Sequence, residues 1–367
     1  MNLLLASLLL VSDLSLEEKV GQLLMTSVFP EAAPDELDSY LDTFAPGHLL
    51  FVGNGWDPEV EQRRVARYQA KSRLPLTIAQ DLEWGLAMRL NDVVVFPKNG
   101  ALAKAELVDI EAMGEEIARE CRILGVNLNL APVVDVNNNP LNPIIKDRSF
   151  GSDPYEVAAR GAAYMRGLKK GGIKSCAKHF PGHGNTDTDS HTSLPIIPLT
   201  YTELKSLELI PFKHLIDEGV DCVLTAHLAL PLIDPQALSA SLSPFVIQEI
   251  LQKDLGFRGI VLTDDLLMQA IPLSYGEAAI QAFLAGNDIL LFTNHSGGLA
   301  RVRQALREAH RALVTAVLSG RIPEEELNAR VEKILSFKAT LFQGQEEGEL
   351  ITEQALQLSE KLRTRPL

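Results

Sequence analysis

Eight short apolar runs, separated by longer amphipathic stretches, recur along the chain, and this alternation constrains the fold more than any other feature. Most runs are hydrophobic throughout, which is typical of parallel strands covered on both faces. Strand and helix alternating eight times predict an α/β protein with a (β/α)8, TIM-like barrel; a doubly wound open sheet is the alternative. The predicted strands are residues 23–28, 48–53, 76–80, 126–133, 173–179, 222–227, 260–264 and 288–293.

Helix boundary signals lie between these runs. Asp-Pro pairs at 57–58 and 153–154 each supply an N-cap residue followed by proline at the first helical position. The second pair precedes a helix expected to end at Lys170, before two glycines. A further helix is predicted from Thr202 to Gly219.

The barrel is expected to form a single domain over residues 16–342, followed by a polar tail, 343–367, with a short helix. A chain of 367 residues with 46% hydrophobic and 22% charged residues has a globular composition that suits one large barrel. Residues 1–15 are interpreted as a helix covering the barrel bottom, or alternatively as a signal segment. The first interpretation implies a cytoplasmic protein and the second an exported one.

Charge and cysteine content exclude several classes of protein. A formal net charge of −14 repels phosphate backbones and anionic lipid heads, which argues against nucleic acid and membrane-surface partners. The apolar run near the N-terminus is too short to span a bilayer. Three widely spaced cysteines, Cys121, Cys176 and Cys222, fit buried free thiols and not a disulfide framework or zinc ribbon.

Titratable residues follow several of the predicted strands directly. Asp81, His179, His227 and the pair Asp264-Asp265 each come at the end of an apolar run. A charge at the end of a buried strand is costly unless it faces water or a partner. In a barrel these ends meet on one rim, so the sequence predicts a polar pocket there.

The densest polar stretch is residues 178–191, KHFPGHGNTDTDSH, which starts at a strand end and continues as a loop. A metal site formed by His179, His183 and Asp187 is one alternative, but Lys178 would oppose a cation at this position. Loop histidines without a chemical role are another.

This stretch resembles the signature of family three of the glycoside hydrolases, in particular its β-N-acetylglucosaminidase branch. The resemblance extends to residues 133–137, to Arg-Ser-Phe-Gly at 148–151 and to Thr-Asp-Asp at 263–265. It therefore covers roughly residues 16–341. The family fold is a TIM-like barrel, which agrees with the strand and helix pattern.

The resemblance implies the catalytic residues. Asp264 matches the family's nucleophilic aspartate, which forms a covalent glycosyl-enzyme that water hydrolyses with net retention. His191 matches the acid/base histidine of the β-N-acetylglucosaminidase branch, and Asp189 its orienting partner. An imidazole with an ordinary pKa near 6.5 suits this role, because a neighbouring carboxylate fixes its tautomer and raises its basicity.

Substrate-binding residues also carry over from the resemblance. Asp81 matches an aspartate that holds sugar hydroxyls, and Arg148, Lys178 and His179 match positions that contact the hydroxyls and the N-acetyl group. A surface salt bridge is the alternative for Arg148.

Three further residues near the predicted rim are interpreted from their positions. Asp265 is expected to have a structural hydrogen-bonding role. His227 lies either on the pocket floor or in the core, and Trp84 is a candidate for stacking on a sugar ring. Many relatives have Glu-Gly-Gly where this chain has Glu83-Trp84-Gly85, which bears on the leaving-group side of the pocket.

The predicted function is removal of terminal β-linked N-acetylglucosamine from an oligosaccharide or muropeptide. No metal or organic cofactor is implied, and the oligomeric state is not readable. Enzyme alternatives are a β-glucosidase or β-xylosidase, which usually carry a further α/β domain, and a phosphorylase, since an imidazole would not repel phosphate. From another class, the alternative is an inactive sugar-binding barrel.

Overall fold

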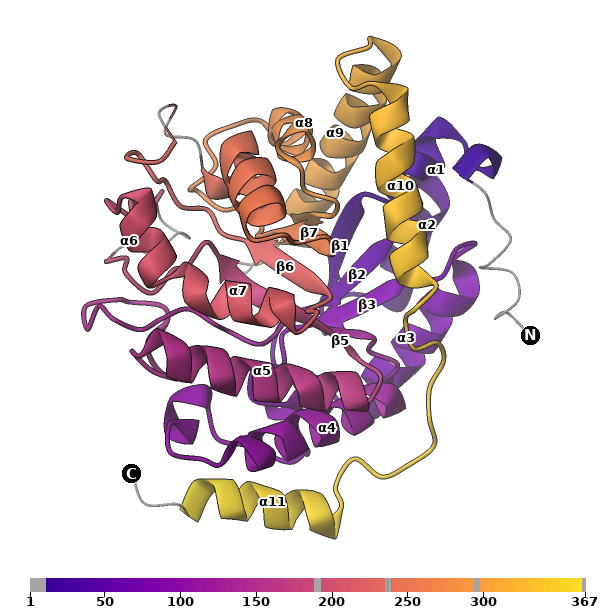
Figure 1. The fold of residues 1–367 in the computed structure, drawn as a ribbon. Coiled ribbons are helices and arrows are strands. Elements are labelled where there is room, and N and C mark those ends of the chain that lie inside the picture. The colour runs from indigo at the N-terminus through magenta and orange to yellow at the C-terminus, as the bar shows by residue number, and fades with distance from the viewer. Residues whose placement is uncertain (1–10, 188–192, 235, 237–238, 294–297, 365–367) are drawn as a thin grey trace.

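The computed structural model describes residues 11–187, 193–234, 236, 239–293 and 298–364. Within these ranges, eight parallel strands lie at the centre of the molecule and helices surround them (Figure 1). Each strand lies inside or within one residue of a predicted run. The strands are β1 (Leu24–Val28), β2 (His48–Phe51), β3 (Thr77–Gln80), β4 (Leu128–Asn129), β5 (Lys174–Phe180), β6 (Cys222–Thr225), β7 (Ile260–Thr263) and β8 (Leu290–Phe292).

The strands follow one another around a nearly closed barrel, in the order β7-β6-β5-β4-β3-β2-β1-β8. Strand β1 pairs with both β2 and β8. The remaining gap is bridged where Leu262 pairs with Ile289 and the Thr263 N–H donates to the Ile289 carbonyl at 3.0 Å. The prediction of a (β/α)8 barrel is therefore confirmed.

A helical segment follows every strand and covers the outside of the barrel (Figure 1). The segment after β6 is the π-helical η7 (Phe245–Asp254). Helix α1 (Leu16–Gly21) precedes the first strand. The remaining helices are α2 (Asp38–Phe44), α3 (Pro58–Lys71), α4 (Leu107–Leu124), α5 (Pro154–Lys170), α6 (Tyr201–Ser206), α7 (Leu209–Asp217), α8 (Tyr275–Ala285), α9 (Leu299–Leu318), α10 (Glu324–Lys338) and α11 (Glu353–Thr364).

Two predicted elements differ from the structure. Strand β4 is only two residues long, and its neighbour β5 is contacted again beyond Pro132, through a single bridge between Val133 and Lys178. The helix predicted from Thr202 to Gly219 is broken at Leu207, between α6 and α7. The cause is Pro211, which cannot donate to the carbonyl of Leu207 and whose ring would clash with it.

The two helix starts predicted from Asp-Pro pairs are confirmed, whereas the helix predicted from Thr202 begins at Tyr201 and is capped by Thr200. Asp57 caps α3 by accepting from the Val60 N–H, and Asp153 caps α5 by accepting from two backbone amides. The three cysteines are buried and free. No helix in the described ranges combines the length and the apolar character needed to cross a membrane.

The C-terminal helix α11 packs against the outer helices of the barrel. Helix α11 lies along the outside of α4 (Figure 1), where Lys361 and Asp109 form an ion pair. Residues 1–10, which hold most of the predicted N-terminal segment, lie outside the described part of the chain.

Helices α4 and α5 approach each other closely through two glycines. A Cβ on Gly167 would lie 2.1 Å from the Glu111 carbonyl oxygen, and one on Gly114 would lie 2.4 Å from the Tyr164 carbonyl oxygen. Both atoms that would be struck are backbone atoms of a neighbouring helix, so a side chain at either position forces the helices apart.

We therefore expect Gly167→Ala to lower the free energy of unfolding by roughly 2–3 kcal/mol, as overpacking does, measured by urea denaturation. In an uncrowded helix the same change would raise stability by up to about 1 kcal/mol. An unchanged or higher denaturation midpoint would contradict the close packing.

Candidate active site

A cavity of about 310 Å³ lies at the carboxyl ends of the strands. Its floor includes four leucines, Leu50, Leu130, Leu224 and Leu291, which come from β2, the end of β4, β6 and β8. Barrels of this type are normally filled by layers of four side chains from alternate strands, and these leucines form one such layer. Charged side chains stand around this apolar floor, which lowers the local dielectric and strengthens their interactions.

Asp81, which directly follows β3, is held between two cations in this cavity. Its Oδ1 accepts from Lys178 Nζ at 2.7 Å, and its Oδ2 accepts from Arg89 at 2.9 Å. Lys178 lies on β5 and is 2% exposed. Burial alone would lower the pKa of Lys178, but Asp81 and Glu83 outweigh this effect and raise it. The ammonium is thus stabilised in its charged form.

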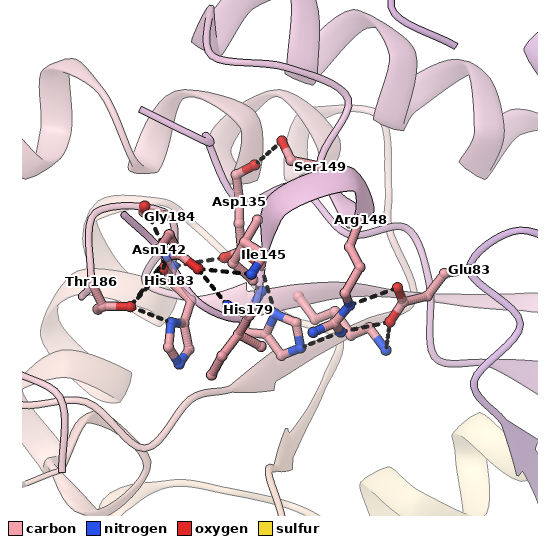
Figure 2. Close-up of polar contacts among 12 residues, drawn as sticks. Glu83, Asp135, Asn142, Ile145, Arg148, Ser149, His179, His183, Gly184 and Thr186 are labelled. Atoms are coloured by element: carbon pink, nitrogen blue, oxygen red, sulfur yellow. Dashed lines mark hydrogen bonds and ion pairs between the residues drawn. The ribbon is translucent and has the colours of Figure 1, made fainter. Parts of the chain in front are cut away.

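Glu83 links Lys178 to Arg148, because it forms ion pairs with both. It accepts two hydrogen bonds from Arg148, at 2.9 and 2.7 Å (Figure 2). Its Oε1 also lies 2.9 Å from Lys178 Nζ. Burial would raise the pKa of Glu83, yet the charges of Arg148 and Lys178 outweigh it and lower the pKa to about 2. The carboxylate also raises the pKa of Arg148. Arg148 is therefore part of the cavity wall and not a surface salt bridge.

His179, the next residue of β5, has both ring nitrogens engaged. Nδ1 lies 2.7 Å from Asp135 Oδ2, and Nε2 lies 3.3 Å from Arg148 Nη2 (Figure 2). A guanidinium can only donate, so Nε2 accepts and the Nδ1–H donates to Asp135. Together, the contacts with Asp135 and Arg148 select one tautomer of the His179 ring and fix its orientation in the cavity.

Asp135 also organises the backbone that follows β5. Its Oδ1 accepts from the N–H groups of His179 and His183, at 3.1 and 2.7 Å. Burial would raise the pKa of Asp135, but the contacts with the two histidines outweigh it and lower the pKa. Burial lowers the pKa of His183, which also lines the cavity.

Asp264, which directly follows β7, lines the same cavity. Its Oδ1 accepts from the Asp265 N–H at 2.8 Å, a contact that orients the carboxylate. Asp265 points elsewhere and accepts from the N–H groups of Leu267 and Thr293. Burial raises the pKa of Asp265 to about 8. The structural role predicted for Asp265 agrees with these contacts.

The structure brings five predicted residues to one cavity: Asp81, Arg148, Lys178, His179 and Asp264. Asp189 and His191 lie outside the described residues. The individual roles of all seven residues stay predictions.

His227 and Trp84, whose roles the sequence left open, do not line the cavity. His227 is fully buried between Ser241 Oγ and the Asp265 carbonyl, so it belongs to the core. Trp84 is not among the residues that line the cavity, and the Lys98 ammonium lies 5.1 Å from its ring centroid. Stacking of Trp84 on a sugar in this cavity is therefore not supported.

Sequence reasoning missed three charged residues of the site: Glu83, Arg89 and Asp135. Glu83 lies two positions after Asp81 and Asp135 follows an apolar run, so the strand-end signal was present in both segments. No local signal points to Arg89, which reaches Asp81 only through the fold.

We expect Glu83→Gln to lower both activity and stability, because it leaves Arg148 and Lys178 buried without their shared carboxylate. A pKa lowered from 4.5 to about 2 contributes roughly 3 kcal/mol to folding above pH 4.5, a contribution that is lost as the pH falls through 2. The difference in unfolding free energy between wild type and variant should therefore shrink between pH 4.5 and 2. Exposed Glu59→Gln is the control, and a pH-independent difference would contradict the charge assignment.

An eight-stranded barrel with a charged cavity at the carboxyl ends of its strands is typical of a barrel enzyme. The family model described as "Glycosyl hydrolase family 3 N terminal domain" matches residues 15–337. The chain belongs to glycoside hydrolase family 3. Fold, site and relatives place it among the glycosidases.

Named relatives agree with this class. Beta-hexosaminidase A of Pseudoalteromonas piscicida is 31% identical over 350 residues, which are 86% of this chain and 56% of that protein. The solved family 3 β-N-acetylglucosaminidase of Paenibacillus sp. str. FPU-7 is 35% identical with a TM-score of 0.86, over 95% of this chain and 68% of that one. A β-glucoside phosphorylase is 26% identical with a TM-score of 0.83, over 96% of this chain and 64% of that one.

Proposed function

We propose that this protein is a retaining, exo-acting β-N-acetylhexosaminidase that removes terminal β-linked N-acetylglucosamine. The observation that carries the proposal is the position of Asp264 on the same cavity as Asp81, Arg148, Lys178 and His179. The names of the β-hexosaminidase and β-N-acetylglucosaminidase relatives support the choice of sugar.

The charges of the cavity support the division of roles among its carboxylates. Asp81 and Glu83 both form ion pairs with Lys178, which suits them to binding and orienting hydroxyl groups. Asp264 lines the same cavity at the end of β7 and is the candidate nucleophile. Its carboxylate oxygen attacks the anomeric carbon, and the bond to the leaving oxygen breaks as the glycosyl-enzyme forms.

The leaving oxygen needs a proton, and Glu83 does not provide one, because its pKa of about 2 keeps it ionised. Asp81 accepts hydrogen bonds from both Lys178 and Arg89, which suits it to binding the sugar. An imidazole fits the task better. In the proposed mechanism His191 protonates the leaving group and then deprotonates the incoming water, and Asp189 orients its ring.

Phosphorolysis is the second candidate function, because a β-glucoside phosphorylase is among the similar structures. An imidazole acid/base would not repel a phosphate nucleophile electrostatically, whereas a carboxylate would. Muropeptides or chitin fragments are the proposed natural substrates. The proposed cytoplasmic location depends instead on the interpretation of residues 1–15 as a helix.

The test is the initial rate on p-nitrophenyl β-N-acetylglucosaminide beside p-nitrophenyl β-glucoside, with and without phosphate. The proposal predicts preference for the acetamido sugar and free N-acetylglucosamine as product. Formation of the sugar 1-phosphate would establish phosphorolysis. Equal or faster turnover of the glucoside would overturn the sugar assignment, and no turnover of either would favour a sugar-binding barrel.

A further inference from the structure

Asn142 lies in the connection between β4 and α5 and is 1% exposed, although its side chain is a polar amide. The two ends of this amide bind two different loops (Figure 2). Its Oδ1 accepts from the N–H groups of Ile144 and Ile145, at 2.9 and 2.8 Å. These residues directly precede the short helical turn η5 (Lys146–Arg148), which ends at Arg148.

The other end of the amide reaches the chain that follows β5. Asn142 Nδ2 donates to the carbonyl oxygens of His183 and Gly184, at 2.8 and 3.0 Å, and lies 3.3 Å from Thr186 Oγ1. Thr186 Oγ1 in turn lies 2.8 Å from His183 Nδ1. The two loops are in backbone contact here, since a Cβ on Gly184 would lie 1.7 Å from the Val136 carbonyl oxygen.

We propose that Asn142 is a positioning residue for the acid/base step of the reaction. It fixes residues 183–186, from which the chain continues to Asp189 and His191, relative to the loop that carries the sugar-binding Arg148. This inference rests on the proposed function. An amide serves both loops, because its oxygen accepts from two N–H groups of one loop while its two N–H donors face the carbonyl oxygens of the other.

Asn142→Asp is the sharpest test, because it keeps the accepting oxygen and the shape of the side chain. The new oxygen would face the two carbonyl oxygens that now accept hydrogen bonds, and this repulsion should move residues 183–186. A misplacement of about 1 Å can lower a rate by about 100-fold. Asn137→Asp is the matched control, because the Asn137 side-chain amide donates to the Lys146 carbonyl within its own loop.

The measurement is kcat/KM on a series of aryl β-N-acetylglucosaminides whose leaving groups differ in acidity. Because protonation matters most for poor leaving groups, we expect Asn142→Asp to lose about 100-fold on these and less than about 10-fold on activated ones. Asn137→Asp should stay within about twofold of wild type. If Asn142→Asp does not fold, Asn142→Ala removes the amide without adding charge and should show the same trend.

The outcomes separate this proposal from the proposed function. An equal loss across all leaving groups, or no loss, with a normal wild-type series would overturn the positioning role of Asn142 alone. A wild type that does not turn over these glycosides would overturn the proposed function, and the role of Asn142 with it.

Discussion

Asp264→Ala is expected to abolish turnover of every glycoside, lowering kcat by on the order of 10⁴–10⁶-fold, as loss of a nucleophile does in other covalent enzymes. The proposed reaction forms a bond between this carboxylate and the anomeric carbon, so no substrate avoids the loss. The fold should survive, because the Asp264 carboxylate lies on the cavity wall, whereas Asp265 ties the loop to the Thr293 N–H.

The measurement is kcat on p-nitrophenyl β-N-acetylglucosaminide, with the thermal unfolding midpoint recorded on the same preparation. Asp217→Ala, which alters an exposed carboxylate on α7 that pairs with Lys213, is the control and should retain wild-type activity. Added azide should restore part of the activity of Asp264→Ala by occupying the space of the carboxylate, giving a glycosyl azide of inverted configuration. Full activity without azide would exclude Asp264 as the nucleophile.

His191→Ala is expected to produce the second largest effect, and its size should depend on the leaving group. General acid catalysis contributes about 10²–10⁴-fold. We therefore expect kcat/KM to fall by about 1,000-fold for a sugar leaving group and by less than about 10-fold for a dinitrophenyl group, which departs without a proton.

The parameter kcat/KM is the one to compare, because it reports the first chemical step. Water activation in the second step also needs the base, so activated substrates should show a rapid burst of phenol followed by slow turnover. Exposed His214→Ala on α7 is the control. Equal losses in kcat/KM on all leaving groups would contradict the acid/base role.

The strand pattern was readable from the chain because parallel strands covered on both faces must be apolar along their whole length. Each observed strand therefore coincides with an apolar run, even where the regular pairing is short, as in β4. Asp81, Lys178, His179 and Asp264 were readable for a related reason. A charge directly after such a run needs a wet site or a partner, and the barrel brings those positions to one rim.

The ion-pair and hydrogen-bond partners of these residues could not be predicted from the sequence. Glu83 holds Arg148, and Lys178 reaches Asp81, across 65 and 97 positions of the sequence. Asp135 and His179 are 44 positions apart. Such pairs depend on which strands become neighbours and on how far a side chain reaches, and neither is encoded in local residue spacing.

The sequence by itself therefore determined the barrel, its order of strands and helices, and the strand ends at which chemistry is possible, because these follow from burial and local periodicity. Only the tertiary structure decided which charge neutralises which. The structure shows that Arg148 lies in the cavity wall and does not form a surface ion pair. It also shows that His227 lies in the core. It also gave Asn142 its two-loop contact, because the free energy of a buried polar group is set by the partners that the fold brings to it.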